Sequence, residues 1–477
     1  MPITSMGGSI AQVGGDLGGE TRQRASAPGR QNDALMWALL FILAVAPLPL
    51  GSNRPFFWTA SATAIGLVGA IYFAYLARRR QKLRVPLSSM RLQLVAFTIL
   101  CGYLVVQMLP IAGVLGIDIL ASAGDVVIRS ESISVAPGTT FLMLMRMMTY
   151  GLFFFLMLQL CRNEGRRALI LNAILAIIAV YALIGLVSLR LGDTNLGLPK
   201  WAYFGSATGT FVNRNSYATF LAFGICIAAT LLIRLLARRI GRHAADPEPG
   251  DGFQMVAYAA IYLLLLTTVV ATQSRMGLFV SLAGTLTPLV LSIGLGSRPH
   301  ATTAVVGLLA SVVACGTVLA VFGSGVFERL GGIEKSAGTR FNLYDQILTM
   351  IANRPLTGTG GGTFDLAFPL EHELPVNPDV VWDKAHNTYL ALWSELGLIF
   401  GSLPILMFLL LAARLAVSMA KGRGQSAQTI ALAVLIVGGL HSLVDFSLEI
   451  QANTFIFLAL TAIGIGAGVS RTRDDVQ

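Results

Sequence analysis

Residues 385–413 read AHNTYLALWSELGLIFGSLPILMFLLLAA, and this stretch joins a polar segment to a long apolar run. His386 and Asn387 stand at its start, and Gly397 follows after nine intervening residues. An apolar run of this length is sufficient to cross the roughly 30 Å hydrocarbon core of a bilayer. Histidine titrates near neutral pH, so it can take up and release protons under physiological conditions. The stretch predicts a membrane enzyme with a titratable group where a loop meets a membrane helix.

The composition of the whole chain supports a membrane protein. Of its 477 residues, 55% are hydrophobic and 12% are charged, whereas a soluble domain carries about 25% charged residues. Apolar runs of about 20 residues recur along the chain and predict an all-α polytopic membrane protein with about twelve transmembrane helices. The predicted spans are 34–50, 57–77, 92–110, 141–160, 168–189, 216–236, 254–272, 277–296, 301–322, 386–413, 427–444 and 453–470.

The regions between and beyond these spans define the organisation of the chain. Residues 1–33 are polar and rich in Gly and Ser, without the apolar core of a signal peptide, and predict a disordered cytoplasmic tail. Helices 1–9 fill residues 34–322, a large outside loop covers 323–385, and helices 10–12 fill 386–470 before a short inside tail, 471–477.

The distribution of Lys and Arg predicts the orientation. With the N-terminus inside, the inside segments hold about twice as many Lys and Arg residues as the outside segments, as the positive-inside rule requires. The net charge of +10 is therefore mainly a topology signal, with some attraction to anionic lipid. Nucleic-acid binding is not expected, because no soluble domain carries a basic patch interleaved with aromatic residues.

The outside loop 323–385 has a readable order. From Thr339-Arg340 to Asn353 the apolar residues recur at helical spacing, which predicts an amphipathic helix lying along the membrane surface. The glycine-rich segment 358–362 predicts a turn with close backbone approach, and residues 365–385 predict a cap. Elsewhere outside, the weak alternation of residues 126–135 indicates an edge strand.

Three arginines lie near the outside boundary of the membrane. Arg214 precedes one helix, Arg275 occupies the short link between two helices, and Arg340 begins the amphipathic helix. Each alone is either an interface anchor or a ligand for an anion, because the planar guanidinium matches phosphate oxygens. Arg275 fits the anchor interpretation least, since a short outside link has little reason to keep a positive charge.

The histidines allow similar alternatives. His386 is either an interfacial polar residue or a base beside an anion clamp formed by the arginines. His441 and Asp445 lie four residues apart on one expected helical face, where they either orient a substrate hydroxyl or make a buried polar contact. Glu371-His372-Glu373 is interpreted as a solvated loop, and the four cysteines have no metal-ligand spacing, so no metal site is expected.

These motifs together resemble the superfamily of bacterial O-antigen ligases and polymerases over residues of about 205–450. The strongest part is His386-Asn387, nine residues, then Gly397. Ligases usually carry Gly, Thr or Tyr three residues after that glycine, whereas this chain has Phe400. The other matching segments are Thr-Phe-Val-Asn-Arg-Asn at 210–215, Thr-Gln-Ser-Arg at 272–275, Arg340 followed by Asn-Arg-Pro-Leu-Thr-Gly-Thr-Gly at 353–360, Glu-Leu-Gly-Leu at 395–398 and His-Ser-Leu-Val-Asp-Phe at 441–446.

The resemblance implies a glycosyltransferase of the bacterial inner membrane whose active site faces the periplasm. The donor would be a glycan on undecaprenyl diphosphate, and the acceptor a hydroxyl of a glycan or of lipid A-core. Arg275 and Arg340 would hold the diphosphate in place of a metal, and His386 would act as the base. The implied substrate-binding residues are Arg275, Arg340, Arg214, Asn387, His441 and Asp445. Neither a metal nor another cofactor is expected.

Other classes of function remain open from the sequence. Within the enzyme class, a polysaccharide polymerase differs from a ligase only in its acceptor. A secondary transporter with twelve helices would place charges at mid-membrane, whereas here only Arg146 lies clearly within a predicted span. A scaffold subunit would leave the ordered outside loop unexplained.

Overall fold

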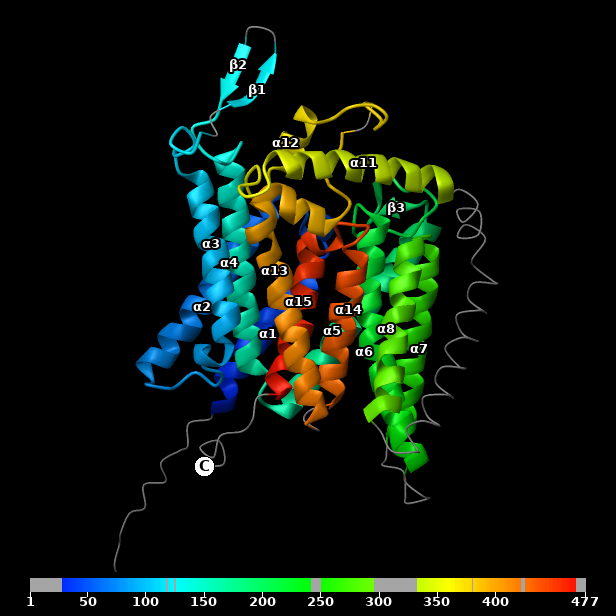
Figure 1. The fold of residues 1–477 in the computed structure, drawn as a ribbon. Coiled ribbons are helices and arrows are strands. Elements are labelled where there is room, and N and C mark those ends of the chain that lie inside the picture. Colours follow the sequence, from blue (N-terminus) through cyan, green and yellow to red (C-terminus); the bar gives the residue numbers. More distant parts are fainter. Residues whose placement is uncertain are drawn as a thin grey trace, which may run out of the picture.

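The computed structural model describes residues 28–116, 119–123, 126–241, 250–295, 333–379, 381–421 and 425–468. Long helices run side by side, and shorter elements cover one end of them (Figure 1). The long helices are α1 (Pro28–Val45), α2 (Pro55–Arg78), α3 (Arg91–Met108), α4 (Pro137–Leu160), α5 (Glu164–Arg190), α6 (Arg214–Gly241), α7 (Asp251–Ala271), α8 (Arg275–Leu295), α13 (Thr388–Ala420), α14 (Gln425–His441) and α15 (Gln451–Gly468).

The covered end is built by the remaining elements. Helix α11 (Ile333–Asn353) lies across the ends of the long helices, and α12 (Phe364–Ala367) follows it (Figure 1). Two small antiparallel sheets stand at this end: β1 (Ile119–Ala123) with β2 (Val126–Arg129), and β3 (Thr194–Asn195) with β4 (Leu198–Pro199). Short 3₁₀ helices occur at Leu50–Ser52, Leu87–Met90, Phe368–Leu370 and Ser447–Glu449.

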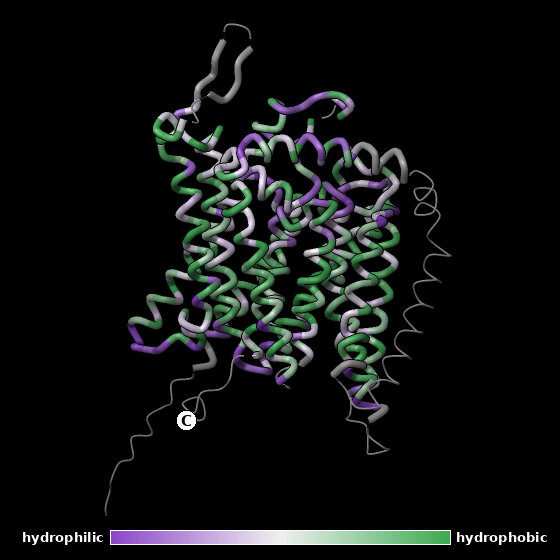
Figure 2. Tube along the Cα trace, in the orientation of Figure 1, coloured by the Kyte–Doolittle hydropathy of each residue, from purple (hydrophilic) through white to green (hydrophobic). Residues whose placement is uncertain are grey.

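The helices have the lengths that a membrane requires. Within the described ranges, nine helices are long and apolar enough to cross a bilayer, and residues 31–45 and 426–441 form two shorter apolar helices. The structure confirms an all-α polytopic membrane protein. The predicted span 301–322 lies outside the described residues, so twelve remains a predicted number. Figure 2 shows hydrophobic residues along the middle of the long helices and hydrophilic residues at their ends.

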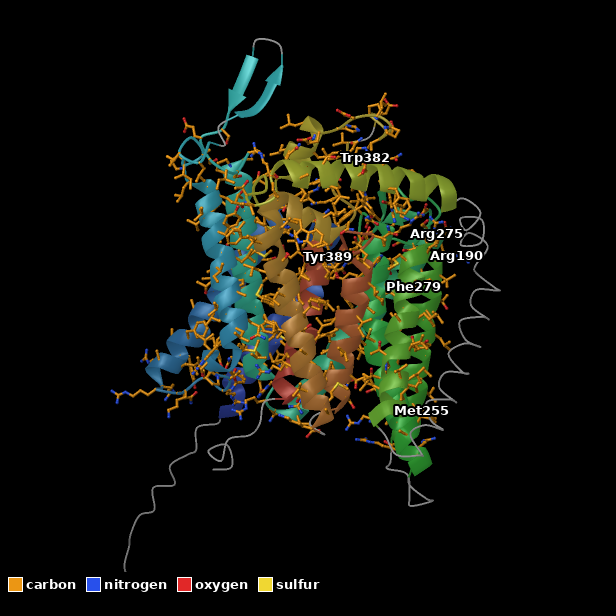
Figure 3. The ribbon with its side chains drawn as sticks, viewed as in Figure 1. Arg190, Met255, Arg275, Phe279, Trp382 and Tyr389 are labelled. Atoms are coloured by element: carbon orange, nitrogen blue, oxygen red, sulfur yellow. The ribbon has the colours of Figure 1, made fainter. Side chains whose placement is uncertain are left out.

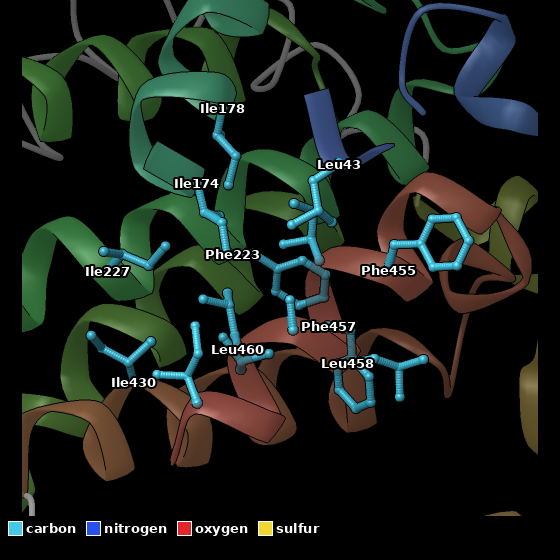
Figure 4. Close-up of a cluster of buried hydrophobic side chains, with 14 of the residues drawn as sticks. Leu43, Ile174, Ile178, Phe223, Ile227, Ile430, Phe455, Phe457, Leu458 and Leu460 are labelled. Atoms are coloured by element: carbon cyan, nitrogen blue, oxygen red, sulfur yellow. The ribbon is translucent and has the colours of Figure 1, made fainter. Parts of the chain in front are cut away.

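Helices α15 and α6 form the centre of the bundle. In its most apolar window α15 is 83% buried and α6 is 72% buried, whereas α2 and α3 are each 22% buried. Figure 4 shows the cluster that joins them, with Phe223 of α6 packed near Phe455, Phe457 and Leu460 of α15. The outer helices leave apolar side chains exposed, as helices do that face lipid rather than water.

The segments predicted to lie outside gather at one end of the bundle. α11, α12 and both sheets lie at this end, and so does the connection from α7 to α8 (Figure 1). Alternating helix directions bring every second connection to the same end. The predicted amphipathic helix is present, but it begins at Ile333, earlier than the Thr339 of the sequence prediction.

The structure corrects two local predictions. The predicted tail 1–33 extends too far, because α1 begins at Pro28, and Asp33 on α1 forms a 2.7 Å ion pair with Arg166 at the start of α5. Residues 1–27 lie outside the described residues. The strand predicted at 126–135 ends at Arg129, because the hydroxyl of Ser132 donates a 2.7 Å hydrogen bond to the Ser134 carbonyl and turns the chain.

Candidate functional site

His386 lies directly before α13, at the end of the bundle that α11 covers. The next residue, Asn387, caps the helix: its side-chain oxygen accepts hydrogen bonds from the amides of Tyr389 (3.0 Å) and Leu390 (3.1 Å). The Asn387 side-chain amide donates to the carbonyl of Leu443 at 2.9 Å. Asn387, predicted to bind substrate, thus has both side-chain groups engaged within the protein and fixes the position of His386.

The segment after α14 holds the start of α13 from the other side. The amide of Thr388 donates to the Ser442 carbonyl at 2.9 Å, and its hydroxyl donates to the Asp445 carbonyl at 3.1 Å. The Tyr389 hydroxyl donates to the Gly439 carbonyl at 2.8 Å. Two motifs far apart in the sequence are therefore joined into one rigid unit.

Helix α13 is not the single span predicted at 386–413. Gly397 has φ 73° and ψ 167°, a conformation that is essentially restricted to glycine, and it breaks the helix after its first turns. A Cβ atom at Gly397 would collide with the carbonyl of Leu356. The nine residues between Asn387 and Gly397 are thus a separate short helical piece, which packs beneath α11 through Leu390 and Ala391.

Gly397→Ala is expected to destabilise the protein by at least about 1–3 kcal/mol, because alanine cannot adopt this backbone conformation without strain. Thermal unfolding in detergent measures the change. The matched control is Gly102→Ala on α3, where a Cβ atom meets open space and the backbone is helical. Equal melting temperatures for the two variants would show that the break at Gly397 is not required.

The glycine-rich segment 358–362 approaches this break closely, as predicted. A Cβ atom at Gly358 would collide with the carbonyl of Glu395. The carboxylate of Glu395 accepts a hydrogen bond from the Gly362 amide at 2.8 Å, and Gln107 accepts one from the Gly361 amide at 3.0 Å. The amides of residues 358–360 donate to backbone carbonyls and those of Gly361 and Gly362 to side chains, so the loop serves to anchor α13.

The imidazole of His386 has an aromatic surrounding. The rings of Trp382 and Phe446 meet it edge-on, with centroids 6.0 and 5.1 Å away. Its Nδ1 atom is buried without a hydrogen-bond partner among the described residues, and its backbone carbonyl accepts a 2.9 Å hydrogen bond from the Tyr344 hydroxyl. A buried nitrogen without a partner is unusual in a stable interior, and Nε2 of His441 is in the same condition.

The charges around His386 act in both directions on its pKa. Burial lowers the pKa below its ordinary value, the Asp445 carboxylate raises it, and Arg340 lowers it again. Asp383 also raises this pKa and Lys384 lowers it. The net effect is a lowered pKa, so the imidazole is neutral at neutral pH and able to accept a proton.

Asp445 is fully buried beside this imidazole. One carboxylate oxygen accepts a 3.2 Å hydrogen bond from the Asn215 side chain, and the other accepts a short hydrogen bond from the Ser447 hydroxyl. Asn215 in turn accepts a 2.8 Å hydrogen bond from the Ser274 hydroxyl. Burial raises the pKa of Asp445, against the lowering effect of these hydrogen bonds and of His386. The network connects the starts of α6 and α8 to the segment beside His386.

His441 and Asp445 do not share a helical face, contrary to the sequence prediction. Helix α14 ends at His441, and Asp445 lies in the turn that follows. The Nδ1 atom of His441 makes a short hydrogen bond with the Thr219 hydroxyl on α6, and the residue is 1% exposed. The two side chains therefore reach separate partners: Nδ1 of His441 joins α14 to α6, while its Nε2 atom is buried without a partner among the described residues.

Two of the three predicted arginines are associated with the site by their electrostatics. Arg340 is among the charges acting on His386 and on Asp445. The guanidinium of Arg214 lies over the Tyr203 ring, 5.2 Å from its centroid. Burial raises the pKa of the Tyr203 hydroxyl, which Asp445 also raises and which both arginines lower. The Tyr203 hydroxyl therefore interacts with the charges of Asp445 and of both arginines, and no sequence motif predicted its role.

Arg275 begins α8 at the same end of the bundle. Figure 3 shows Arg275 and Trp382 toward the end where α11 lies, whereas Met255 is near the opposite end. The neighbouring Ser274 belongs to the Asp445 network through Asn215. Arg275 is thus adjacent in sequence to the network, while its contact with the region of His386 stays a prediction.

A second charged cluster contains Lys384, and the sequence did not predict it. Lys384 forms a 3.1 Å ion pair with Glu449, and the Glu449 carbonyl accepts a 2.6 Å hydrogen bond from Arg146. Arg146 lies over the ring of Trp58, 4.2 Å from its centroid. Burial lowers the pKa of Lys384, but the Glu449 carboxylate outweighs this and the pKa is raised. Only the tertiary fold brings these residues together.

Two residues of the cap, one carboxylate and one imidazole, have side-chain contacts within the fold. Glu371 accepts hydrogen bonds from the Asn353 side chain at 3.1 Å, and His372 stacks on Phe368 with centroids 5.4 Å apart. Within the ranges that the structure describes, no group of three or more His, Cys, Asp or Glu side chains is placed to hold a metal ion.

Phe400, the departure from the usual ligase pattern, has a packing role. Its ring stacks on Tyr103 of α3, with centroids 3.6 Å apart and planes inclined by 7°. The Tyr103 hydroxyl donates a 2.6 Å hydrogen bond to the Thr357 carbonyl, next to the glycine-rich segment. Phe400 therefore supports the break at Gly397 from the membrane side, and its identity follows from this packing.

The comparisons with known proteins concern the family of the chain. No curated protein matches the chain. A family model described as O-antigen ligase matches residues 260–405, a segment that contains Arg275, Arg340, His386 and Gly397. Over this segment the chain is similar to the O-antigen ligase family.

Proposed function

We propose that the protein transfers a glycan from undecaprenyl diphosphate to an acceptor hydroxyl at the periplasmic face of the bacterial inner membrane. The observation that carries the proposal is His386, a neutral base with a buried, unpartnered Nδ1 atom beside Asp445 and Arg340. It lies within the segment that matches the O-antigen ligase family, whose members are glycosyltransferase-like enzymes.

The arginines are suited to the donor. In the proposed complex the lipid chain lies in the bilayer and the diphosphate meets Arg340, Arg275 and Arg214 at the membrane boundary. Guanidinium groups bind phosphate oxygens through parallel hydrogen bonds and remain charged at every physiological pH. They stabilise the negative charge that grows on the leaving diphosphate, which is where electrostatic stabilisation is most effective.

The transfer is a single displacement. His386 removes the proton from the acceptor hydroxyl as that oxygen bonds to the anomeric carbon of the donor sugar. The bond from this carbon to the diphosphate oxygen breaks at the same time, and undecaprenyl diphosphate leaves with the bonding electrons. Configuration at the anomeric carbon is inverted. Asp445 faces the imidazolium that forms and stabilises its charge.

The proposed acceptor is the core sugar of a lipopolysaccharide, or a growing glycan if the protein is a polymerase. These two reactions share donor, base and clamp, and differ only in the molecule that carries the attacking hydroxyl. The test is transfer by the purified protein in nanodiscs, with an undecaprenyl-diphosphate glycan and either lipid A-core or a second donor as acceptor. Movement of the intact lipid-linked glycan across the membrane without transfer would instead indicate a transporter.

The proposed reaction has a defined dependence on pH. The base must be neutral, and the pKa of His386 lies below its ordinary value of 6.5, so kcat should fall only on acidification below that value. Asp445→Asn removes a charge that raises this pKa, so the acidic limb should move to lower pH. The measurement is kcat from about pH 5 to about pH 8, which brackets the histidine range.

The control for this prediction is Asp379→Asn, which changes an exposed carboxylate of the cap. It should leave the acidic limb in place. An acidic limb that does not move in Asp445→Asn, or that moves equally in both variants, would contradict the coupling of Asp445 to His386.

Transfer is expected to be independent of divalent metal. Arg275 and Arg340 would supply two positive charges to the diphosphate, and a metal ion at the same position would be repelled by them, since metal sites gather anionic or neutral ligands. Activity in nanodiscs should survive EDTA. Loss of activity on chelation with rescue by Mg²⁺ or Mn²⁺ would show that the arginines do not replace a metal.

A further inference from the structure

A recess lies at the end of the bundle opposite to α11. It is formed where the C-terminal ends of α13 and α15 meet the start of α14 (Figure 1). Its volume is about 140 Å³, several times the roughly 30 Å³ that one water molecule occupies in the liquid. The polar side chains that line it are Arg414, Ser418, Lys421 and Gln428.

Gln428 is a polar side chain in this recess with an unused hydrogen-bonding atom. The residue is fully buried, and its Nε2 donates a 2.6 Å hydrogen bond to the Ser418 hydroxyl. Its Oε1 has no partner among the described residues. If the amide is flipped, Nε2 takes the place of Oε1 and has no partner in turn. One atom of the Gln428 amide therefore needs a further partner in either orientation. Buried side-chain polar atoms normally have such a partner.

The charges that line the recess have one sign. Arg414 and Lys421 are cationic, and none of the described residues lining the recess is acidic. Nη1 of Arg414 donates a 2.5 Å hydrogen bond to the Ser89 carbonyl, which fixes the guanidinium in place. A guanidinium carries five N–H donors, so the group can hold an anion while it keeps this contact. The apolar side of the recess is formed by Leu415 and Ile465.

We propose that this recess binds the glycerophosphate headgroup of an anionic phospholipid. The phosphate oxygens face Arg414 and Lys421, and a headgroup hydroxyl donates to Oε1 of Gln428 once a side-chain shift exposes that buried atom. The recess lies at the ends of membrane-spanning helices, at the depth where headgroups are found, and Leu415 and Ile465 receive the apolar beginning of the acyl chains. Choline headgroups lack a hydroxyl and carry a cation, so they do not fit.

The site is separate from the proposed glycan transfer, because it lies at the other end of the bundle. Soluble glycerol phosphate presents the same chemical groups, so the experiment must distinguish the two sources. The full-length protein is delipidated in detergent, offered phosphatidylglycerol or phosphatidylcholine, and examined by native mass spectrometry for retained lipid. A parallel arm adds soluble glycerol phosphate as a competitor of retained phosphatidylglycerol.

Wild-type protein should retain phosphatidylglycerol in preference to phosphatidylcholine. Lys421→Ala and Gln428→Leu should each weaken that retention about fivefold, as expected for one surface cation or one hydrogen bond. Arg91→Ala is the matched control, because Arg91 is an exposed cation at the start of α3 that does not line the recess. It should retain lipid as the wild type does.

Three results would overturn the proposal. They are equal retention of the two lipids, unchanged retention in both Lys421→Ala and Gln428→Leu, and an equal loss in Arg91→Ala, which would indicate general attraction to the positive surface. Complete displacement of phosphatidylglycerol by equimolar glycerol phosphate would assign the recess to a soluble phosphate ester in place of a lipid. Melting temperatures of the variants exclude unfolding as the cause of any loss.

Discussion

His386→Ala is expected to reduce glycan transfer by about 10²–10⁴-fold, because positioned general bases contribute factors of this size. The physical reason is the loss of the only group proposed to accept the acceptor proton. The protein should remain folded, since the ring contacts of His386 with Trp382 and Phe446 are edge-on and replaceable. The measurement is single-turnover transfer by purified protein in nanodiscs.

The backbone at this position requires a second variant. His386 has a φ of 49°, in the left-handed region where alanine is strained and asparagine is tolerated. His386→Asn keeps the backbone favourable and removes the base, so it should lose the same activity as His386→Ala. The matched control is His372→Ala. It removes the imidazole of the cap, which stacks on Phe368, and should leave transfer almost unchanged. Wild-type transfer by His386→Asn would refute the assignment of the base.

Replacing Arg340 and Arg275 by lysine is expected to weaken transfer although the charge is kept. A lysine ammonium is a point charge and cannot make the two parallel hydrogen bonds of a guanidinium. One lost charge-assisted hydrogen bond costs about 1.5–3 kcal/mol, so each substitution should lower kcat/KM for the donor by about 10–100-fold. The remaining donor binding should also become more sensitive to salt.

Arg190→Lys provides the control for these substitutions. Arg190 is the last residue of α5, is exposed, and lies toward the same end of the bundle as Arg275 (Figure 3). Full activity of the Arg275, Arg340 double lysine variant would identify both residues as interface anchors. A loss in Arg340→Lys alone would place the clamp on Arg340 and Arg214, next to Tyr203.

The fold class followed from the sequence because hydrophobic length is a local property. Each apolar run is long enough to span a bilayer whatever its neighbours do, and the helices found at Pro55–Arg78 and Glu164–Arg190 differ by only a few residues from the predicted spans 57–77 and 168–189. The prediction of one continuous helix over 386–413 was wrong at Gly397, where a single residue changes the backbone. Gly397 breaks α13, and its hydrophobic neighbours conceal the break.

The candidate site was predictable to the extent that its residues stand at helix ends. His386, Arg275 and Arg340 could be proposed because charged or titratable side chains are costly beside a membrane and draw attention there. The partners of Lys384 were not found, because Glu449 and Arg146 belong to segments far apart in the sequence. Tyr203 was missed because an aromatic residue in an outside loop is common and does not by itself indicate a site.

The sequence by itself determined the helices, their alternation across the membrane and the end at which polar residues collect, since each depends on local hydrophobicity and charge. The tertiary structure decided which polar residues work together. In the fold His441 and Asp445 reach separate partners, and the Asn387 side chain caps the N-terminus of α13. Asp445 accepts a hydrogen bond from Asn215 instead. The physical reason is that hydrogen bonds and charge interactions act over a few ångströms, and only the packing of helices sets those distances.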